Sequence, residues 1–118
     1  MEVTLVAQEG GVARLRAAGE ITHTTLAESP EPIGKLLGND GFAQTVLLSL
    51  AEVSFMDSSG VGWLLGCRRR FREGGGQFVL HSIPPNLLEI LRVMRLEQVL
   101  RLAPDENAAL ALVQNQTQ

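Results

Sequence analysis

The order of apolar and polar residues predicts an alternation of strands and helices along the chain. Residues 1–7 are rich in Val, Thr and Leu, which favours a strand, and the turn signal Glu9-Gly10-Gly11 follows. A second, moderately apolar run begins at Val12 and stops near Gly19. Two such runs joined by a glycine-containing turn are typical of an antiparallel hairpin.

Between residues 21 and 72 the sequence predicts one short helix weakly, and one strand and one long helix strongly. Between residues 21 and 40 we expect only a short helix, over about residues 31–37, with Ser29 as its cap and Pro30 at its first position. The continuous apolar run Thr45–Leu50 indicates a central strand covered on both faces. Residues 51–56 are expected to form a loop or a short extended piece. A long helix then begins at Asp57-Ser58, continues to about residue 72 and ends at three consecutive glycines.

The last third of the chain continues the alternation. A strand is expected over Gln77–His81, a helix over Asn86–Met94, a short strand over Val99–Leu102 and a terminal helix that ends near residue 113. Together these elements predict an α/β fold in a single domain, residues 1–113, with a mixed sheet of four to five strands and about four helices. Residues 114–118 are expected to form a polar tail.

Composition narrows the function of such a domain. With 118 residues and a net charge of −3, the chain does not resemble a nucleic-acid binder that relies on bulk positive charge. Its one cysteine, Cys67, excludes an internal disulfide and a multi-cysteine zinc site. The sequence has neither a membrane-length apolar run nor a signal-peptide pattern. We therefore expect a cytoplasmic domain with no metal or cofactor, no membrane insertion and no direct nucleic-acid partner.

The segment Asp57-Ser58-Ser59-Gly60 carries most of the functional argument. The first N–H groups of a helix have no intrahelical partner, and the helix dipole favours negative charge, so a phosphate on a serine of this first turn is readily accommodated. It would add about −1.5 to −2 charges beside Asp57, and a partner shaped for a neutral hydroxyl would meet a dianion. A simpler interpretation is that Asp57 or Ser58 only caps the helix.

The surface of this helix favours a contact with another chain. Val61, Leu64 and Leu65 share one face and are assigned to the core. The opposite side contains Ser59, Gly62, Trp63, Gly66 and Arg70. A glycine inside a helix costs roughly 1 kcal/mol relative to alanine, which a merely solvated face does not require. Trp63 is expected either to anchor such a contact or to pack against its own domain.

The run Ser54–Gly62, with the sequence SFMDSSGVG, resembles the signature of STAS domains, in particular of bacterial anti-sigma factor antagonists. Other segments match the family in the same order, and the resemblance covers nearly the whole chain: Ala18–Ile21, Val46–Leu50, Gly74–Leu80 and Ile83–Leu96. It implies that Ser58 is phosphorylated, with Asp57, Ser59 and Gly60 shaping its site. It also implies that Glu20 and Thr22 lie on the partner-binding surface together with Gly62, Trp63 and Gly66.

The resemblance further implies a mechanism. In the family, an anti-sigma factor with a serine kinase fold phosphorylates the antagonist. The unmodified antagonist binds the anti-sigma factor and so releases a sigma factor, and a PP2C-type phosphatase restores that form. The chain is then a ligand and substrate of other proteins and not an enzyme. The alternative is a STAS scaffold subunit of a stressosome-like or lipid-transport complex, without a sigma-factor partner.

Three features depart from the family pattern. Thr22 stands where an Asp is usual, which puts the identity or affinity of the partner in question. Pro30 and Pro32 fall where the family has a longer first helix. Arg95 stands where glycine is usual, and a left-handed helix end at that position would be strained.

Other functional classes fit the residues less well. A receiver domain needs an acidic pair after its first strand and a late lysine, whereas here Lys35 is the only lysine. A hydrolase of the nucleophile-elbow type needs Gly-x-Ser-x-Gly, which is absent, and His81 at a strand end is expected to be a surface histidine. The arginines at 68–70 and 72 fit a solvated helix end, with phosphate or acidic-partner contact as the alternative.

Overall fold

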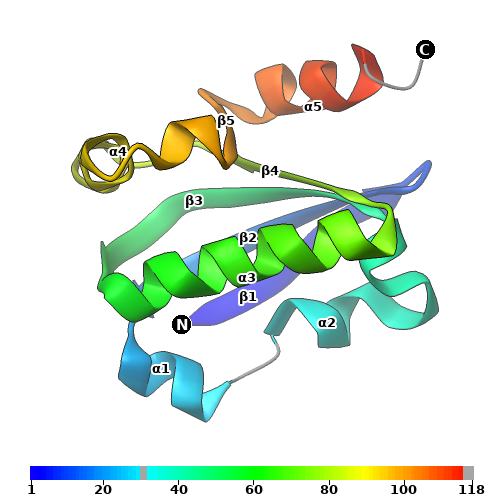
Figure 1. Ribbon diagram of the computed structural model, residues 1–118. Helices are drawn as coiled ribbons and strands as arrows, with labels where there is room; N and C mark the ends of the chain where they lie inside the picture. Colours follow the sequence, from blue (N-terminus) through cyan, green and yellow to red (C-terminus); the bar gives the residue numbers. More distant parts are fainter. Residues whose placement is uncertain (30–31, 116–118) are drawn as a thin grey trace.

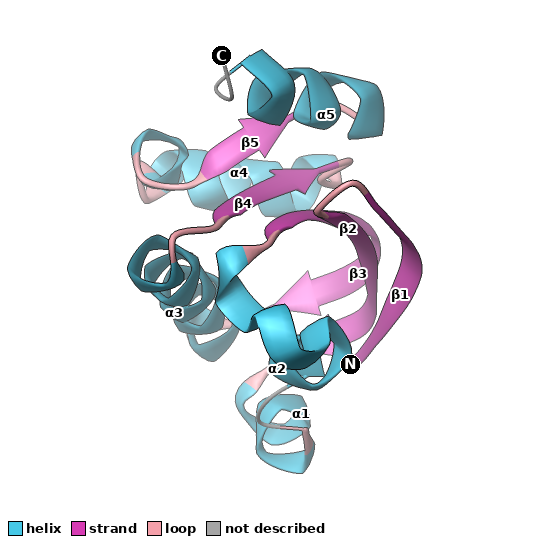
Figure 2. Ribbon diagram, turned by 90° about the vertical axis from the view of Figure 1, so that its right-hand side faces the viewer, coloured by secondary structure: helices cyan, strands magenta, loops and turns pink. Residues whose placement is uncertain are grey.

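A five-stranded sheet organises the molecule, with strands in the order β1-β2-β3-β4-β5. The computed structural model describes residues 1–29 and 32–115. Figures 1 and 2 show the sheet with α3 on one side and α5 on the other. β1 and β2 pair antiparallel, while the remaining neighbours pair parallel, so the sheet is mixed. The strands are β1 Glu2–Glu9, β2 Val12–Ile21, β3 Thr45–Met56, β4 Gln77–His81 and β5 Arg101–Ala103.

Five α-helices and two short 3₁₀ helices lie in the described part of the chain, one α-helix more than the sequence predicts. They are α1 His23–Glu28, α2 Pro32–Leu37, η1 Gly38–Ala43, α3 Ser58–Gly74, α4 Pro85–Val93, η2 Leu96–Gln98 and α5 Glu106–Asn115. Within that same part, no helix combines the length and apolarity needed to cross a membrane.

β3 explains why Thr45–Leu50 is apolar without interruption. Successive side chains of a strand point to opposite faces. Val46, Leu48 and Leu50 belong to the larger core cluster, which includes buried side chains of α2, α3 and α4. Leu47 belongs to a second cluster, beneath α5. The prediction of a central strand covered on both faces is confirmed.

The weakly patterned region contains the clearest errors of the sequence prediction. Ser29 is the C-cap of α1, not the N-cap of the next helix, because α1 already occupies His23–Glu28. Pro30, expected in the first turn, lies outside the described residues, as do 116–118 of the expected tail. Residues 51–56, expected as a loop or short extended piece, continue β3, since they still pair with β2.

Two predictions about backbone conformation at helix ends are confirmed. α3 ends at Gly75, which has a left-handed φ of +84°, as the run of glycines indicates. Arg95 has a φ of +58°, the strained left-handed conformation expected where the family has glycine. The β5 strand is shorter and later than the expected Val99–Leu102, because Val99 is still the C-cap of η2 and has a helical conformation.

His81 is buried and not on the surface as expected, with 3% of its area exposed. Its Nδ1 lies 2.9 Å from Ser82 Oγ, and its Nε2 has no partner among the described residues. Burial lowers the pKa of His81, against the opposing effect of the Glu106 and Asp105 carboxylates. The ring is therefore held in its neutral form.

This histidine makes stability depend on pH. A pKa that is lower in the folded than in the unfolded state means that the unfolded chain binds more protons as the pH falls through about 6.5. We expect the free energy of unfolding, measured with urea, to be lower at about pH 5.5 than at about pH 7.5. His81→Leu should remove much of this difference, and an equal difference in the variant would contradict the assignment.

Candidate functional site

Asp57 caps two helices at once. Its Oδ1 accepts a hydrogen bond from the Gly60 N–H of α3 at 3.0 Å, and its Oδ2 accepts one from the His23 N–H of α1 at 3.1 Å. The ends of β2 and β3 are brought together by pairing of Ile21 with Met56, so both helices begin side by side (Figure 1). The capping interpretation therefore applies to Asp57.

The same hydrogen bonds fix the charge of Asp57. The backbone N–H of His23 has the largest effect and lowers the pKa of the carboxyl group. Partial burial opposes it, and the N–H groups of Gly60 and Ser59 reinforce it. At neutral pH, Asp57 thus places a negative charge beside the next residue of the chain.

Ser58 is the first residue of α3, and its side chain is exposed. Its hydroxyl has no hydrogen-bond partner among the described residues, because Asp57 already serves as the cap. Ser59, one residue further, is half-buried. Of the two serines, Ser58 is the one that presents a free hydroxyl to an approaching protein.

Gly60 is required by close packing. A Cβ atom at this position would lie 2.4 Å from the carbonyl oxygen of Ile21 and 2.4 Å from Cγ of Met56. No real Cβ tolerates such contacts without a shift of the backbone. Gly60 therefore allows the first turn of α3 to lie against the ends of β2 and β3, which holds the Ser58 position.

Glu20 and Thr22 lie at the same end of the sheet as Ser58. Glu20 is exposed and pairs across the strands with Phe55. Thr22 is half-buried and is the N-cap of α1, in a reciprocal capping box with Thr25. The structure thus gives Thr22 a local structural role, in addition to its place beside the site.

Phe55 is a site residue that the sequence prediction missed. Its side chain is 51% exposed, two residues before Asp57. The sequence contains no clear signal for this exposure, because simple alternation would place Phe55 on the same face as the buried Val53. The pairing of β2 with β3 shifts register between Gly19 and Glu20, the partner of Phe55, and the alternation is broken there. An exposed aromatic ring beside Ser58 is typical of a contact surface.

Gly62, Trp63 and Gly66 lie one to two turns further along α3. The two glycines are exposed, and a Cβ atom at either would meet no atom within 4 Å. Trp63 is half-buried and packs against the larger core cluster. The expectation that Trp63 packs against its own domain is confirmed, and its role as an anchor for a partner stays a prediction.

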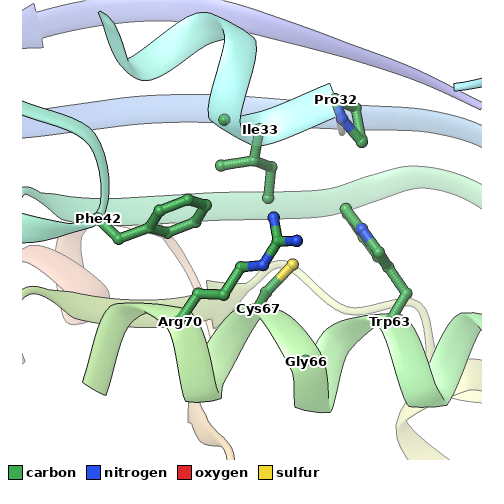
Figure 3. A pocket seen from close by; sticks show the side chains of 8 residues that line it. Pro32, Ile33, Phe42, Trp63, Gly66, Cys67 and Arg70 are labelled. Atoms are coloured by element: carbon green, nitrogen blue, oxygen red, sulfur yellow. The ribbon is translucent and has the colours of Figure 1, made fainter. Parts of the chain in front are cut away.

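A small pocket of about 130 Å³ lies between α3 and the α2–η1 segment (Figure 3). Figure 3 shows Trp63 and Phe42 on opposite sides of the pocket, with Cys67 and Arg70 pointing between them. Cys67 is 6% exposed, as expected of a cysteine that acts as a small core residue. Trp63 and Gly66 thus line this pocket together with residues of α2.

Comparisons with known proteins agree with this fold. A family model described as "STAS domain" matches residues 4–109. A protein of Lysinibacillus sphaericus named "Anti-sigma F factor antagonist" is 29% identical over 107 residues, and the alignment covers 91% of this chain and 89% of the relative.

Solved structures give the same picture. A STAS domain protein of Planctomyces limnophilus, described as an anti-sigma-factor antagonist, superposes with a TM-score of 0.78 at 21% identity, covering 95% of this chain and 97% of that one. The Bacillus cell fate determinant SpoIIAA in its phosphorylated form gives a TM-score of 0.66 at 24% identity, covering 94% and 98%. At these identities the likeness concerns the fold.

Proposed function

This chain belongs to the STAS domain family, and from that premise we propose that it is an anti-sigma factor antagonist controlled by phosphorylation of Ser58. One observation carries the proposal: Ser58 has an exposed, unpartnered hydroxyl at the first position of α3, directly beside the ionised Asp57. Two similar proteins are named as anti-sigma factor antagonists, and a third is described in a phosphorylated form, which supports the same function.

In this proposal the unmodified surface binds and sequesters an anti-sigma factor, and a sigma factor is thereby released. The contact surface consists of Glu20, Thr22 and Phe55 around Ser58, and it extends along α3 to the open glycines Gly62 and Gly66. Gly62 and Gly66 leave room for a close approach of the partner's backbone, because a Cβ atom added at either position would meet no atom within 4 Å. The protein then works as a ligand and substrate, without catalysis of its own.

Phosphorylation reverses this binding through charge. The dipole at the N-terminus of α3 favours the negative charge of a phosphate on Ser58, and the exposed position of this residue gives the group room outside the core. The added charge of about −1.5 to −2 lies next to Asp57, whose lowered pKa keeps it ionised. A partner surface that fits one carboxylate and a neutral hydroxyl then meets strong local negative charge.

The proposed partners follow from this cycle. The anti-sigma factor is itself the serine kinase that transfers phosphate from ATP to Ser58. A PP2C-type phosphatase hydrolyses the phosphoserine and restores binding. Neither step requires a residue of this chain to act as acid or base, and Asp57, Ser59 and Gly60 serve to position the acceptor.

Incubation with the candidate anti-sigma kinases of the same genome and ATP tests the proposal. Intact mass should increase by a single phosphate, which peptide mapping places on Ser58. Ser58→Ala should accept none, whereas the matched control Ser59→Ala should still accept one. Phosphate on Ser59, or no transfer by any of these kinases, would contradict the proposal and favour a scaffold role.

A further inference from the structure

The opposite end of α3 contains a groove that the proposed function does not use. It has a volume of about 310 Å³ and lies between the last turns of α3 and the starts of β4 and β5. Figure 2 shows β4 and β5 side by side, with α3 leading directly into β4. The residues of its lining that matter for a ligand are Arg68, Arg72, Arg101, Phe71, Phe78 and Val99. Along α3 the groove begins at Arg68, about 15 Å from Ser58, and extends to the end of the helix, about 25 Å from Ser58.

Three arginines and no acidic residue line this groove. Arg68 and Arg72 are four residues apart on α3, so their side chains lie on the same face of the helix. Arg101 comes from β5, where its guanidinium donates to Gln77 Oε1 at 2.9 Å and to the Leu112 carbonyl at 3.4 Å. A cluster of three positive charges is notable in a chain whose net charge is −3.

The cluster is not neutralised by nearby carboxylates. Within residues 1–29 and 32–115, neither Arg68 nor Arg72 has a carboxylate partner, whereas their neighbour Arg69 pairs with Glu73 at 2.9 Å. The negative end of the helix dipole accounts for an arginine in the last turn of α3. It does not account for Arg101, which a separate strand brings to the same groove.

We propose that this groove binds a small molecule through a phosphate group. The planar guanidinium groups of arginine match the geometry of phosphate oxygens and bind them in pairs of hydrogen bonds. The volume lies at the lower end of the range of small-molecule pockets. The carbonyl groups at the end of α3 repel an anion, so the contacts come from the three side chains.

The rest of the groove limits the kind of ligand. Phe71 and Phe78 are only 1% and 6% exposed, so neither ring offers a free face on which a nucleic acid base would stack. Val99, 39% exposed, provides an apolar contact for a few carbon atoms. The ligand is therefore recognised by its phosphate and a short carbon skeleton.

Titration of the full chain with inorganic pyrophosphate, followed by calorimetry, tests the site. We expect saturable binding of one pyrophosphate per chain, weakened about tenfold by Arg72→Gln through loss of charge-assisted hydrogen bonds. Arg69→Gln is the matched control, since it removes the same charge from the same helix outside the groove, and should weaken binding by less than about threefold. Thermal unfolding of both variants confirms that they are folded, and Arg68→Gln repeats the test at a second position.

Three results would overturn the proposal. The first is the absence of saturable binding at millimolar pyrophosphate. The second is equal weakening by Arg69→Gln and Arg72→Gln, which would indicate diffuse attraction without a site. The third is tighter binding of a phosphoserine peptide than of pyrophosphate, which would show that the groove recognises a phosphorylated protein and not a small molecule. None of these measurements involves an anti-sigma factor, so their outcome is separate from that of the proposed function.

Discussion

Replacing Gly60 by alanine is expected to lower the free energy of unfolding by about 3 kcal/mol. The new methyl group would lie 2.4 Å from both the Ile21 carbonyl oxygen and Met56 Cγ, and the carbonyl belongs to the backbone of β2, which has little freedom to move. Relief requires that the first turn of α3 separate from the sheet, which also breaks the capping by Asp57. Urea unfolding followed by the fluorescence of Trp63 measures the loss.

The same helix supplies the control for Gly60. Gly62→Ala and Gly66→Ala add a methyl group where no atom lies within 4 Å, and each should raise the free energy of unfolding by up to about 1 kcal/mol through helix propensity alone. If Gly60→Ala left the free energy of unfolding unchanged, the first turn of α3 could not be closely packed against the ends of β2 and β3. A higher free energy of unfolding in Gly62→Ala and Gly66→Ala would show that the fold does not require glycine at these positions. Contact with a partner would then be the reason for glycine there.

Ser58→Asp is expected to weaken binding to the anti-sigma factor by about 100-fold, because like charges brought together in an interface cost several kcal/mol. The variant places a second carboxylate beside Asp57 and imitates part of the charge of phosphoserine. Stability should not fall in parallel, since a carboxylate in the first turn of a helix is favourable. Calorimetric titration of the anti-sigma factor with each variant gives the affinities.

Ser58→Asn separates charge from size in this experiment. Asparagine has nearly the shape of aspartate and no charge, so the variant should retain most of the affinity of the unmodified protein. Ser58→Ala should also bind, because the hydroxyl has no partner within the described residues. Equal losses in Ser58→Asn and Ser58→Asp would assign the effect to steric fit and reject repulsion as the mechanism.

Much of the fold follows from local sequence signals. The uninterrupted apolar run at Thr45–Leu50 indicates a doubly covered strand, and the glycines at 74–76 fix the end of α3. α1 is the element that escaped prediction, because no residue in it is fully buried and it therefore has no apolar period. The start of α1 is fixed by a capping box between Thr22 and Thr25. Two threonines at this spacing occur in turns as well as in helices, so the sequence alone does not identify the helix.

The candidate site was predictable at Ser58 and Asp57, since both belong to one contiguous motif. The second hydrogen bond of Asp57, to the His23 N–H, was not predictable, because it depends on the parallel pairing that places Ile21 beside Met56. Arg101 comes to line the same groove as Arg68 and Arg72 by the same means, because strand pairing places it beside Val79, 22 residues earlier in the sequence. Local patterns contain no information about such long-range contacts.

α1 is expected to open more easily than the rest of the fold. A six-residue helix without a fully buried side chain has little local stability of its own, so its opening costs much less free energy than opening of the sheet. The hydrogen bond from the His23 N–H to Asp57 ties this helix to the rigid start of α3. Amide hydrogen exchange in α1 should therefore be fast relative to β3, and a protein that binds beside Ser58 would slow it by ordering the segment.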